Sequence, residues 1–532
     1  SGAVTHSSAY NYRANKLAAR IAEILGEDGK PYKDEAEKIL SAMNSRLWIP
    51  KNGCWAEYEE FMGLKRKHES AALWTVYTTI DCGACNEKQA YEATRYIDAH
   101  IPHIPVIAKG LEEKGYSTIS TSNWMPYSWS INNVASAEVM HTALAYFEAG
   151  RSDEGFNLMK SNILDQMYIG DSPANFGQVS FYDAARGECY RDFGDNIGIS
   201  SRTLINGLFG VLPDALYDRC VIRPGFPSNW KHAKFTSPYL IYTFNRVDTV
   251  GLSPKDSYTI VPKFLQPLNI VLRVRMPYQN VKNATVNGKQ TDYRLDHISG
   301  DVNMLELVIT GGGMSRVVIE WDGGKVATVV STSYDSVGQK KTEGCDFNEI
   351  KSSDCRIVNI DKSLNANVSD IFNNKYLSPS SPYTTLRIPV QGIGEWCHPK
   401  LSADICDSVL RTMVKKNILR TSIAIPFRSF SKGNNIVYTS LWNNYPDRVV
   451  IPIKGKASHA YLLMAGSTNH MQSRIDNGII VVTYQDGSTD SLHLVNPDNW
   501  CPIEQDYYVD GKAFNTPSPR PYRIHLGSGL VS

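Results

Sequence analysis

The pattern of hydrophobic and polar positions changes near residue 215. Before it, seven stretches place apolar residues three or four positions apart, the repeat of an amphipathic α-helix. Gly150 closes the fifth stretch and Ser152-Asp153-Glu154 opens the sixth. The N-terminal part is therefore predicted to be a series of helical hairpins. The stretches are residues 10–26, 34–47, 67–80, 86–99, 131–149, 152–168 and 198–210.

Between residues 216 and 330 apolar and polar residues alternate with period two, as in strands with one buried face. The runs are YTIVPKF, NIVLRVRMP, NMLELVIT and SRVVIEWDG. Turn signals, Asn287-Gly288 and Gly311-Gly312-Gly313, separate them. This region is predicted to be an antiparallel β-sandwich.

Residues 331–390 are rich in Ser, Asn and Asp and lack a regular pattern, and strand-like runs return after residue 416. These later runs are TSIAIPF, NIVYTSLW, RVVIPI, HAYLLMAG, NGIIVVTYQDGS and SLHLV. A second β-sandwich or jelly roll is predicted. The chain is thus expected to be an α+β multidomain protein: a helical domain over 1–215, a sandwich over 216–330, and a linker plus C-terminal sandwich over 331–532.

The composition excludes some classes of protein. With a net charge of +1 and 20% charged residues over 532 positions, nothing favours a nucleic-acid partner. No apolar run reaches the roughly 18 residues of a membrane helix. The first residues, SGAVTHSSAY, carry no signal peptide.

The ten cysteines are scattered, with one close pair, Cys82-Gly-Ala-Cys85. This pair has redox-motif spacing but lacks the surrounding βαβ pattern, so we interpret it as structural. No second pair completes a four-ligand zinc site, and neither a metal nor a cofactor is predicted.

Three clusters in the helical half bring carboxylates together with aromatic and amide side chains. The first covers residues 53–69 and includes CWAEYEEFMG, the second covers 123–142, and the third covers 175–201 and includes ECYRDFGDN. Hydrolysis of a glycosidic bond needs two carboxyl groups, one protonated and one ionised. Trp55 and Tyr58 flank Glu57, and burial against aromatic rings raises a carboxyl pKa. We therefore expect the three clusters to form one carbohydrate site.

Several of these residues also have structural explanations. His141, one turn after Glu138, is often a core residue in such a position. Asp195-Asn196 precedes the helical run IGISSRTLI and is also a suitable helix N-cap. Glu148 is expected on a solvated helix face. The evidence for a site is the clustering, not any single residue.

The stretch DFGDNIGISSRTLINGLFGVLPD, followed by CVIRPGFPSNWKHAKFTSPYLIYTFNR, resembles the end of the catalytic domain of six-hairpin (α/α)6-toroid glycosidases. That group includes α-L-rhamnosidases and α-1,2-L-fucosidases. The segments WMPYSWSINN, HTALAYFEAGR and LLMAGSTN also resemble a family of large bacterial proteins from polysaccharide-utilisation systems, which implies no particular activity.

The resemblance implies an α-toroid followed by β-sandwiches and an inverting glycoside hydrolase. A toroid has more helices than this chain shows, so we expect the chain to be the C-terminal part of a longer protein whose N-terminal portion completes the ring. Glu57, with Glu60 second, is then expected as general acid, and Asp192 or Asp195 as base. Their carboxyl groups should lie about 6.5–9.5 Å apart.

An oligo- or polysaccharide is the expected substrate, and a bacterial periplasmic or extracellular location is expected. One alternative is a polysaccharide lyase using Tyr182 or Tyr190 with His141 and an arginine. Another is a non-catalytic glycan-binding protein. The excess of carboxylates over basic residues in the first and third clusters favours a neutral sugar. The predicted substrate-binding residues are Trp55, Trp124, Trp129, Asn132, Asn133, Glu138, His141, Gln178, Tyr182, Arg186 and Asn196.

Overall fold

A computed structural model of the chain divides into two compact units, each described by itself below. The first comprises residues 1–123 and 133–339, and the second comprises 124–132 and 340–532. The residues that the structure describes are 2–61, 65–106, 110–124, 134–169, 181–183, 188–190, 195–249, 251–334, 350–369, 405–421, 423–440, 445–464, 473–496, 499–500 and 525–526.

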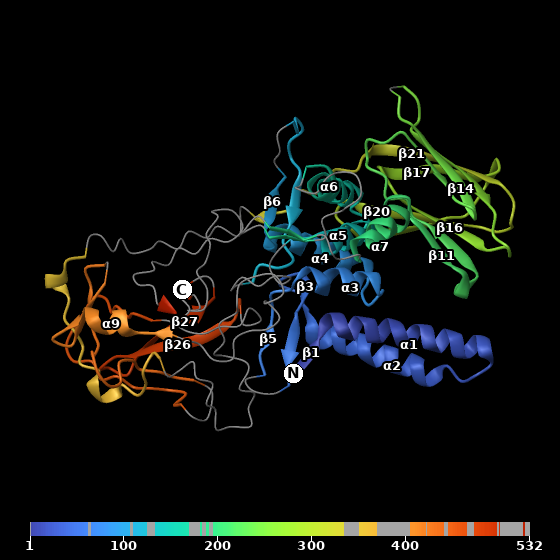
Figure 1. Cartoon of the computed structure of the whole chain (residues 1–532). Helices are drawn as coiled ribbons and strands as arrows, with labels where there is room; N and C mark the ends of the chain where they lie inside the picture. Colours follow the sequence, from blue (N-terminus) through green and yellow to red (C-terminus); the bar gives the residue numbers. More distant parts are fainter. Residues whose placement is uncertain are drawn as a thin grey trace. The chain divides into compact units, whose positions relative to one another are not determined.

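The described residues before 211 form seven α-helices, each overlapping one of the predicted stretches. Helices α1 and α2 lie side by side as an antiparallel hairpin (Figure 1). Short π-helical turns extend several helices at their C-terminal ends. The helices are α1 (Thr5–Leu25), α2 (Lys30–Ala42), α3 (Leu73–Asp81), α4 (Glu87–His100), α5 (Ser136–Glu148), α6 (Ser152–Ile163) and α7 (Asp195–Arg202), and the turns are η1 (Met43–Leu47), η2 (Leu164–Ile169) and η3 (Thr203–Leu208). A closed ring of helical hairpins stays a prediction.

Local signals set several helix ends. Asn86 accepts a hydrogen bond from the backbone N–H of Gln89, whose side chain accepts one from Asn86 N, a capping box that starts α4. Gly26 ends α1 with a left-handed φ of 77°. The predicted helix over 67–80 is wrong at its start, because Lys67–His68 form strand β5, which pairs with β4 (Tyr58–Glu60). This pairing joins a strand before the predicted helix to the first residues of that stretch, so helical periodicity alone does not detect it.

Further short strands lie between the helices. They form small sheets with the strand orders β1-β4-β5, β2-β3, β6-β7 and β10-β9-β8. They are β1 (Gly2–Val4), β2 (Trp48–Ile49), β3 (Cys54–Trp55), β6 (His103–Pro105), β7 (Ser117–Ile119), β8 (Val134–Ala135), β9 (Phe181–Asp183) and β10 (Glu188–Tyr190).

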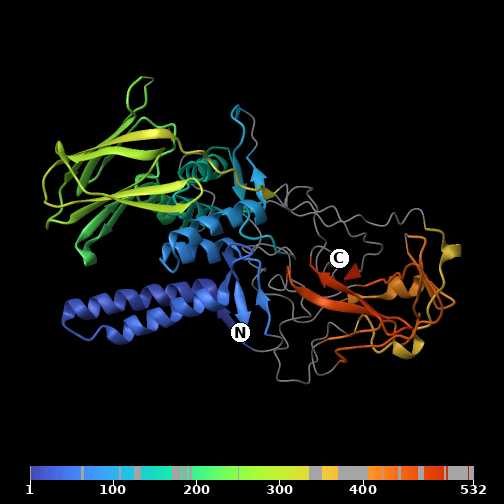
Figure 2. The same ribbon diagram turned by 180° about the vertical axis from the view of Figure 1, so that it is seen from behind.

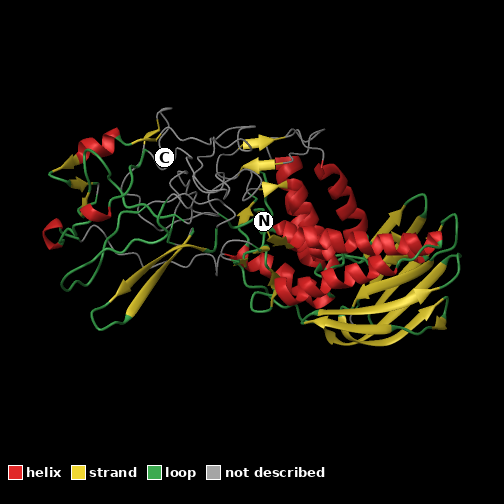
Figure 3. Cartoon of the chain, turned by 90° about the horizontal axis from the view of Figure 1, so that it is seen from below, coloured by secondary structure: helices red, strands yellow, loops and turns green. Residues whose placement is uncertain are grey.

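Two larger sheets follow the helices in the first unit (Figures 2 and 3). One has five strands in the order β11-β12-β16-β20-β19, and the other has six in the order β13-β14-β15-β21-β17-β18. All pairings are antiparallel except β12 with β16, which is parallel. The strands are β11 (Val211–Asp214), β12 (Arg219–Ile222), β13 (His232–Thr236), β14 (Leu240–Val247), β15 (Lys255–Pro262), β16 (Asn269–Arg275), β17 (Tyr278–Val286), β18 (Lys289–Gln290), β19 (Arg294–Ser299), β20 (Val302–Ile309) and β21 (Ser315–Lys325), with the 3₁₀ turn η4 (Ala215–Tyr217) after β11.

The two sheets share one hydrophobic core. Leu272 on β16 and Leu307 on β20 are paired across the first sheet, and both are buried. Ile260 and Ile319 of the second sheet belong to the same core cluster. The alternating residues of the sequence are the ones buried between the sheets, which explains the period-two pattern.

The predicted turn at Asn287-Gly288 is confirmed. Both residues have positive φ, 52° and 78°, and Val286 pairs with Lys289 directly across the turn. A two-residue loop with this backbone matches the twist of the adjoining strands.

Buried charges connect the helices to the sheets within the first unit. Arg273 on β16 donates from Nη2 to both carboxyl oxygens of Glu87, in the first turn of α4, at 2.6 Å. The hydroxyl of Tyr91 on α4 donates to Asp301 at 3.0 Å. Arg273 is 7% exposed and Asp301 is 5% exposed. Both charges also have partners within the sheets, because Arg273 pairs with Asp296 and Glu306 and Asp301 pairs with Arg275. The contacts with α4 add to these networks and connect the helices to the sheets.

The second unit contains short elements. They are α9 (Ser408–Met413), β22 (Ile405–Cys406) paired with β28 (His525–Leu526), a sheet of β23 (Val414–Lys415), β24 (Ile418–Arg420) and β25 (Pro426–Arg428), a hairpin of β26 (Asp476–Thr483) and β27 (Thr489–Val495), and the 3₁₀ turns η6 (Ser352–Asp354) and η7 (Asp361–Ser363).

Three runs predicted as strands are wrong over their described residues. Residues 435–440 and 445–464 form no strand there, only an isolated bridge between Ala366 and Ile436. Val450 and Ile453 are 69% and 56% exposed. The alternation exists in the sequence, but no neighbouring strand in the described part covers these residues, and a strand needs a partner for its backbone groups.

Gly210 lies where the chain leaves η3 and enters β11, with φ of 67°. A Cβ there would stand 1.9 Å from the carbonyl oxygen of Arg223. We expect Gly210→Ala to lower the free energy of unfolding by more than about 3 kcal/mol, above the usual range for one substitution. The measurement is chemical denaturation followed by circular dichroism.

Gly83→Ala is the matched control. Gly83 also has positive φ, 64°, but no atom lies within 4 Å of the place that a Cβ would occupy there. It should cost about 1 kcal/mol, the backbone strain alone. Equal losses in the two variants would show that the approach to Arg223 is not what requires glycine.

Candidate functional site

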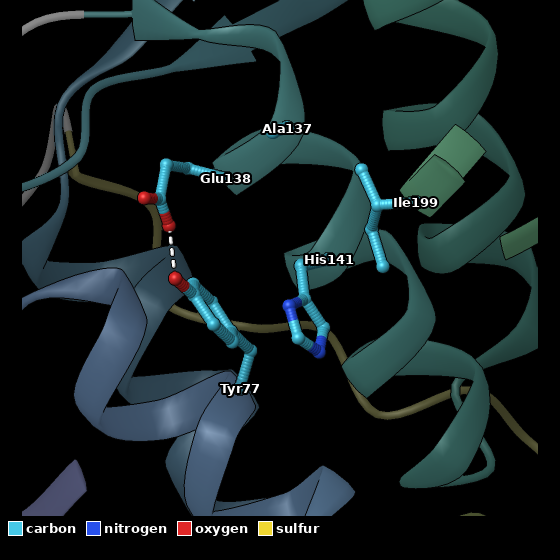
Figure 4. A pocket seen from close by; sticks show the side chains of 5 residues that line it. All are labelled: Tyr77, Ala137, Glu138, His141 and Ile199. Carbon is cyan, nitrogen blue, oxygen red and sulfur yellow. Dashed lines mark hydrogen bonds between the residues drawn. The ribbon is translucent and has the colours of Figure 1, made fainter. Parts of the chain in front are cut away.

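A pocket of about 220 Å³ lies between α3, α5 and α7 in the first unit. Figure 4 shows its side chains converging from these helices. Glu138 and His141, both predicted as substrate-binding residues, are on its wall. The lining residues are Tyr77, Ala137, Glu138, His141 and Ile199.

Glu138 and Tyr77 form a hydrogen-bonded pair in this pocket. The Tyr77 hydroxyl donates to Oε2 of Glu138. Burial, followed by the charge of Glu138 and this hydrogen bond, raises the pKa of Tyr77 well above its usual value. Tyr77 is therefore a neutral donor, and it holds the Glu138 carboxylate in one orientation. Glu138 is in the first turn of α5, where the helix dipole favours a negative charge.

His141 is held on two sides. Its ring stacks on Tyr77 with centroids 4.1 Å apart and an interplanar angle of 22°. Its Nε2 lies 3.1 Å from Oδ2 of Asp81, the last residue of α3. His141 and Glu138 are three residues apart on α5, so both project from the same helix face.

Asp81 lies behind His141 and forms ion pairs with two arginines. Arg202 donates from Nη1 to Oδ2 at 2.7 Å and from Nη2 to Oδ1. Arg13 of α1 lies 3.6 Å from Oδ1. Burial opposes ionisation, but the hydrogen bonds from His141 and Arg202 outweigh it and hold the pKa of Asp81 well below its usual range. Asp81 is therefore an ionised, 7% exposed carboxylate.

Glu57, predicted as general acid, is buried at the N-terminus of α3. It accepts hydrogen bonds from the backbone N–H of Ala72 at 3.1 Å, from Trp74 Nε1 at 2.6 Å and from Thr75 Oγ1 at 2.6 Å. These partners are all donors, so this geometry is that of a helix-capping carboxylate. Its charge is near enough to contribute to the raised pKa of Tyr77. Glu57 thus lies next to the pocket but is not on its wall.

The other described candidates from the first cluster contact protein groups and do not line the pocket. Glu60 accepts from the backbone N–H of Arg66 at 3.1 Å and pairs with its guanidinium at 3.3 Å. Trp55 is fully buried and packs edge-on against Trp48. Trp124, from the second cluster, is fully buried as well. A buried ring offers no face for a sugar to stack on in this state of the protein.

The structure describes only part of the third cluster, and several predicted residues lie outside the described part. Ile199 on α7 lines the pocket, and Asp195 begins α7 four residues earlier, one helical turn away. Asn196 is 1% exposed. Strand β9 includes Tyr182, of whose side chain, like that of Asp195, nothing is described. Trp129, Asn132, Asn133, Gln178, Arg186 and Asp192 are outside the described residues.

Glu148, at the C-terminal end of α5, corrects the expectation of a solvated helix face. The residue is partly buried, and its Oε2 atom is buried without a hydrogen-bond partner. Burial raises the pKa of Glu148 to about 7, against the opposing charge of Arg223. A neutral carboxyl group thus lies close to the charges of Asp81 and Arg202.

Among the described residues, no group of three or more His, Cys, Asp or Glu side chains is arranged to hold a metal ion. Cys82 and Cys85 are both free thiols. Burial raises their pKa values to about 11 and about 12, which makes the reactive thiolate scarce at neutral pH. None of the helices in the described ranges combines the length and apolar character needed to cross a membrane.

Tyr77, Asp81, Ile199 and Arg202 are not among the site residues predicted from the sequence. A signal for two of them exists in the sequence. Tyr77 lies in the stretch 67–80 that is predicted as helix, and Asp81 follows it directly, four residues after Tyr77, so a continued helix places the phenol and the carboxylate on one face. Glu138 and His141, by contrast, are predicted because they belong to the second cluster of carboxylate, aromatic and amide side chains. Pairing the two faces, however, requires knowing that α3 and α5 are neighbours.

No family model and no curated protein matches the sequence. Among solved structures, the chain is similar to glycoside hydrolases. An α-L-rhamnosidase from Streptomyces avermitilis, in complex with L-rhamnose, is 14% identical with a TM-score of 0.33, over 58% of this chain and 26% of that one. A GH63 mannosylglycerate hydrolase from Thermus thermophilus is 14% identical with a TM-score of 0.27, over 37% and 44%. A GH127 β-L-arabinofuranosidase from Geobacillus stearothermophilus is 9% identical with a TM-score of 0.22, over 47% and 41%.

The chain thus spans less than half the length of each of these three structures. Similarity at this level does not assign the chain to any of their families.

Glu148 predicts a pH dependence of stability. Its pKa is about 4.3 in an unfolded chain and about 7 in the folded one, so ionisation above pH 7 opposes folding. The contribution of Glu148 to the free energy of unfolding should fall as the pH rises from about 4 to 7. Glu148→Gln cannot ionise, and above pH 7 it should be more stable than the wild type by on the order of 2 kcal/mol, a value discounted for partial exposure.

The measurement is urea denaturation from pH 4 to pH 8. Glu35→Gln is the control, because Glu35 on α2 is 51% exposed and pairs only with Lys38 at 3.5 Å. It should leave the pH dependence unchanged. A Glu148→Gln curve parallel to the wild-type curve would contradict the assignment of Glu148 as a neutral acid.

Proposed function

We propose that the chain is a glycoside hydrolase that holds a sugar in the pocket between α3, α5 and α7, with Glu138 as its catalytic base. The observation that carries the proposal is a carboxylate on the pocket wall next to a neutral phenol and an imidazole. Hydroxyl groups of a sugar need this combination of donors and acceptors. Hydrolysis by inversion needs an ionised carboxylate to activate water.

Glu138 is assigned as the base because of its hydrogen bond with Tyr77. Tyr77 keeps its proton because its pKa is raised, so the hydrogen bond runs from the phenol to the carboxylate. A carboxylate that accepts this bond is fixed in direction, as the activation of a water molecule requires. Tyr77 thereby positions the base.

The second carboxyl group, the acid, is proposed to be Asp195. It begins α7 one turn before Ile199, which lines the pocket. Asp192, three residues earlier, stays a candidate. Glu57 and Glu60 are disfavoured as acids because their contacts are with donors or an arginine. A separation of about 6.5–9.5 Å between the two carboxyl groups is expected for inversion.

The pocket volume favours one sugar ring. About 220 Å³ is below the range of about 300–1,000 Å³ typical of drug-sized ligands. The described wall carries Glu138 and no lysine or arginine, which favours a neutral sugar over a uronate. The source of the glycan, an extracellular or periplasmic location, and an N-terminal portion that completes the helical ring stay predictions.

A polysaccharide lyase is the second candidate, because Tyr77 and His141 stack in the same pocket. A lyase base would have to be a phenolate or a neutral imidazole. The raised pKa of Tyr77 makes the phenolate costly. A lyase leaves an unsaturated product that absorbs ultraviolet light, and a hydrolase product does not, so the absorbance of the products separates the two.

Glu138→Gln tests the proposed base. It keeps the size of the side chain but cannot take up a proton, so kcat should fall about 10²- to 10⁴-fold. The assay is a panel of neutral aryl glycosides, each with a poor and a good leaving group. Since water activation is needed in both cases, the loss should be equal for both leaving groups.

Two variants provide contrast. Asp195→Asn should lose activity with the poor leaving group and recover it with the good one, which needs no acid. Glu148→Gln, on the same helix as Glu138 but away from the pocket wall, should keep kcat within about twofold. Full activity of Glu138→Gln would exclude Glu138 as base, and binding without turnover by the wild type would support the glycan-binding alternative.

A further inference from the structure

The His141 side chain has one ring nitrogen that is already engaged and one that is not. Nε2 is 3.1 Å from Asp81 Oδ2. Among the described residues no hydrogen bond involves Nδ1. Figure 4 shows the ring between Tyr77 and Ile199, with one nitrogen on the side of Glu138 and Tyr77. Because Nε2 is the atom engaged by Asp81, the nitrogen left for the pocket is Nδ1.

Asp81 decides which nitrogen carries the hydrogen. An ionised carboxylate only accepts hydrogen bonds, so the Nε2 that faces it must donate. Asp81 cannot turn to present a different atom, because Arg202 binds both of its oxygens. Arg13 adds a second guanidinium group, 3.6 Å from Asp81. The stack on Tyr77 also restrains rotation of the imidazole.

We propose that Asp81, held by Arg202, is a positioning residue that fixes the Nε2–H form of His141 and so presents Nδ1 as an acceptor to a sugar hydroxyl in the pocket. The use of Nδ1 rests on the proposed function, whereas the fixed tautomer does not. Asp81 is not on the pocket wall and does not touch the sugar.

Asp81→Asn should reverse the tautomer. The amide has one acceptor oxygen, and the two N–H groups of Arg202 compete for it. The amide NH₂ is then left facing Nε2, which must become the acceptor, so the hydrogen moves to Nδ1. The sugar hydroxyl would meet a donor in place of an acceptor.

The first measurement needs no substrate. Long-range ¹H–¹⁵N correlation spectra of the full chain, labelled in histidine, report the tautomer of each neutral ring. The resonances of His141 are those lost in His141→Gln. The neutral form is followed in a pH series up to the point where the ring no longer titrates. We expect Nε2–H in the wild type and Nδ1–H in Asp81→Asn. Nδ1–H in the wild type, or an unchanged tautomer in Asp81→Asn, would overturn the proposal.

The matched control is Asp256→Asn. Asp256 on β15 is also buried and also accepts two bonds from one arginine, Arg246, at 2.7 and 2.8 Å, but it is in the sheets and not near His141. It reproduces the loss of a buried bidentate ion pair. The His141 tautomer should stay Nε2–H in this variant, and a change there would show that general destabilisation moves the tautomer.

The second measurement uses an aryl glycoside that the wild type hydrolyses. Asp81→Asn should raise KM about tenfold, the worth of one hydrogen bond to the sugar, with a smaller change in kcat. His141→Asn, whose amide can reach the place of Nδ1, should keep a lower KM than His141→Gln, whose amide reaches the place of Nε2. The reverse order would exclude Nδ1 as the contact. If the wild type hydrolyses no glycoside, the proposed function fails, while the spectra still decide the tautomer.

Discussion

The carboxylate of Asp81 is the charge on which the candidate site depends. It lies at the C-terminal end of α3, where the helix dipole is itself negative, so it needs partners that are positive or that donate hydrogen bonds. They come from three other helices: Arg13 from α1, His141 from α5 and Arg202 from α7. One buried anion thus brings four helices to a common point directly behind the pocket. If any of these partners were removed, charge would remain in a poorly solvated place.

Each end of α3 has a buried carboxylate that needs partners, and the two carboxylates obtain them from different places. At the N-terminus, Glu57 is satisfied by donors that the start of the helix itself supplies: Ala72 N–H, Trp74 Nε1 and Thr75 Oγ1. At the C-terminus, the partners of Asp81 come from other helices. Tyr77 lies between these ends and donates to Glu138 of the neighbouring helix. Glu57 therefore stabilises α3 locally, whereas Asp81 determines how α3 packs against the helices that carry the other pocket residues.

The sequence predicts what depends on neighbours in the chain and misses what depends on pairing. The helices and the Asn287-Gly288 turn follow from local spacing and backbone preference. Strand β5 lies in a stretch that is predicted as helix, because helical periodicity does not detect its pairing with β4. Asp81 and Arg202 are 121 residues apart, so no local pattern joins them. Glu57 was selected for its aromatic neighbours in sequence, but its actual partners lie 15 to 18 residues further on. The sequence indicates which types of side chain gather in the helical half, but it does not predict the helix packing that determines the partners of each one.

The contacts of Arg273 with Glu87 and of Tyr91 with Asp301 constrain how the sequence of this chain can evolve. Each joins a residue of α4 to a strand or loop of the sheets, and each includes a charged group that is almost fully removed from water. A recombination event that replaced the sheets alone would have to supply a cation that faces Glu87 and a hydrogen-bond acceptor that faces Tyr91. Helix α4 and the sheets are thereby constrained to be inherited together.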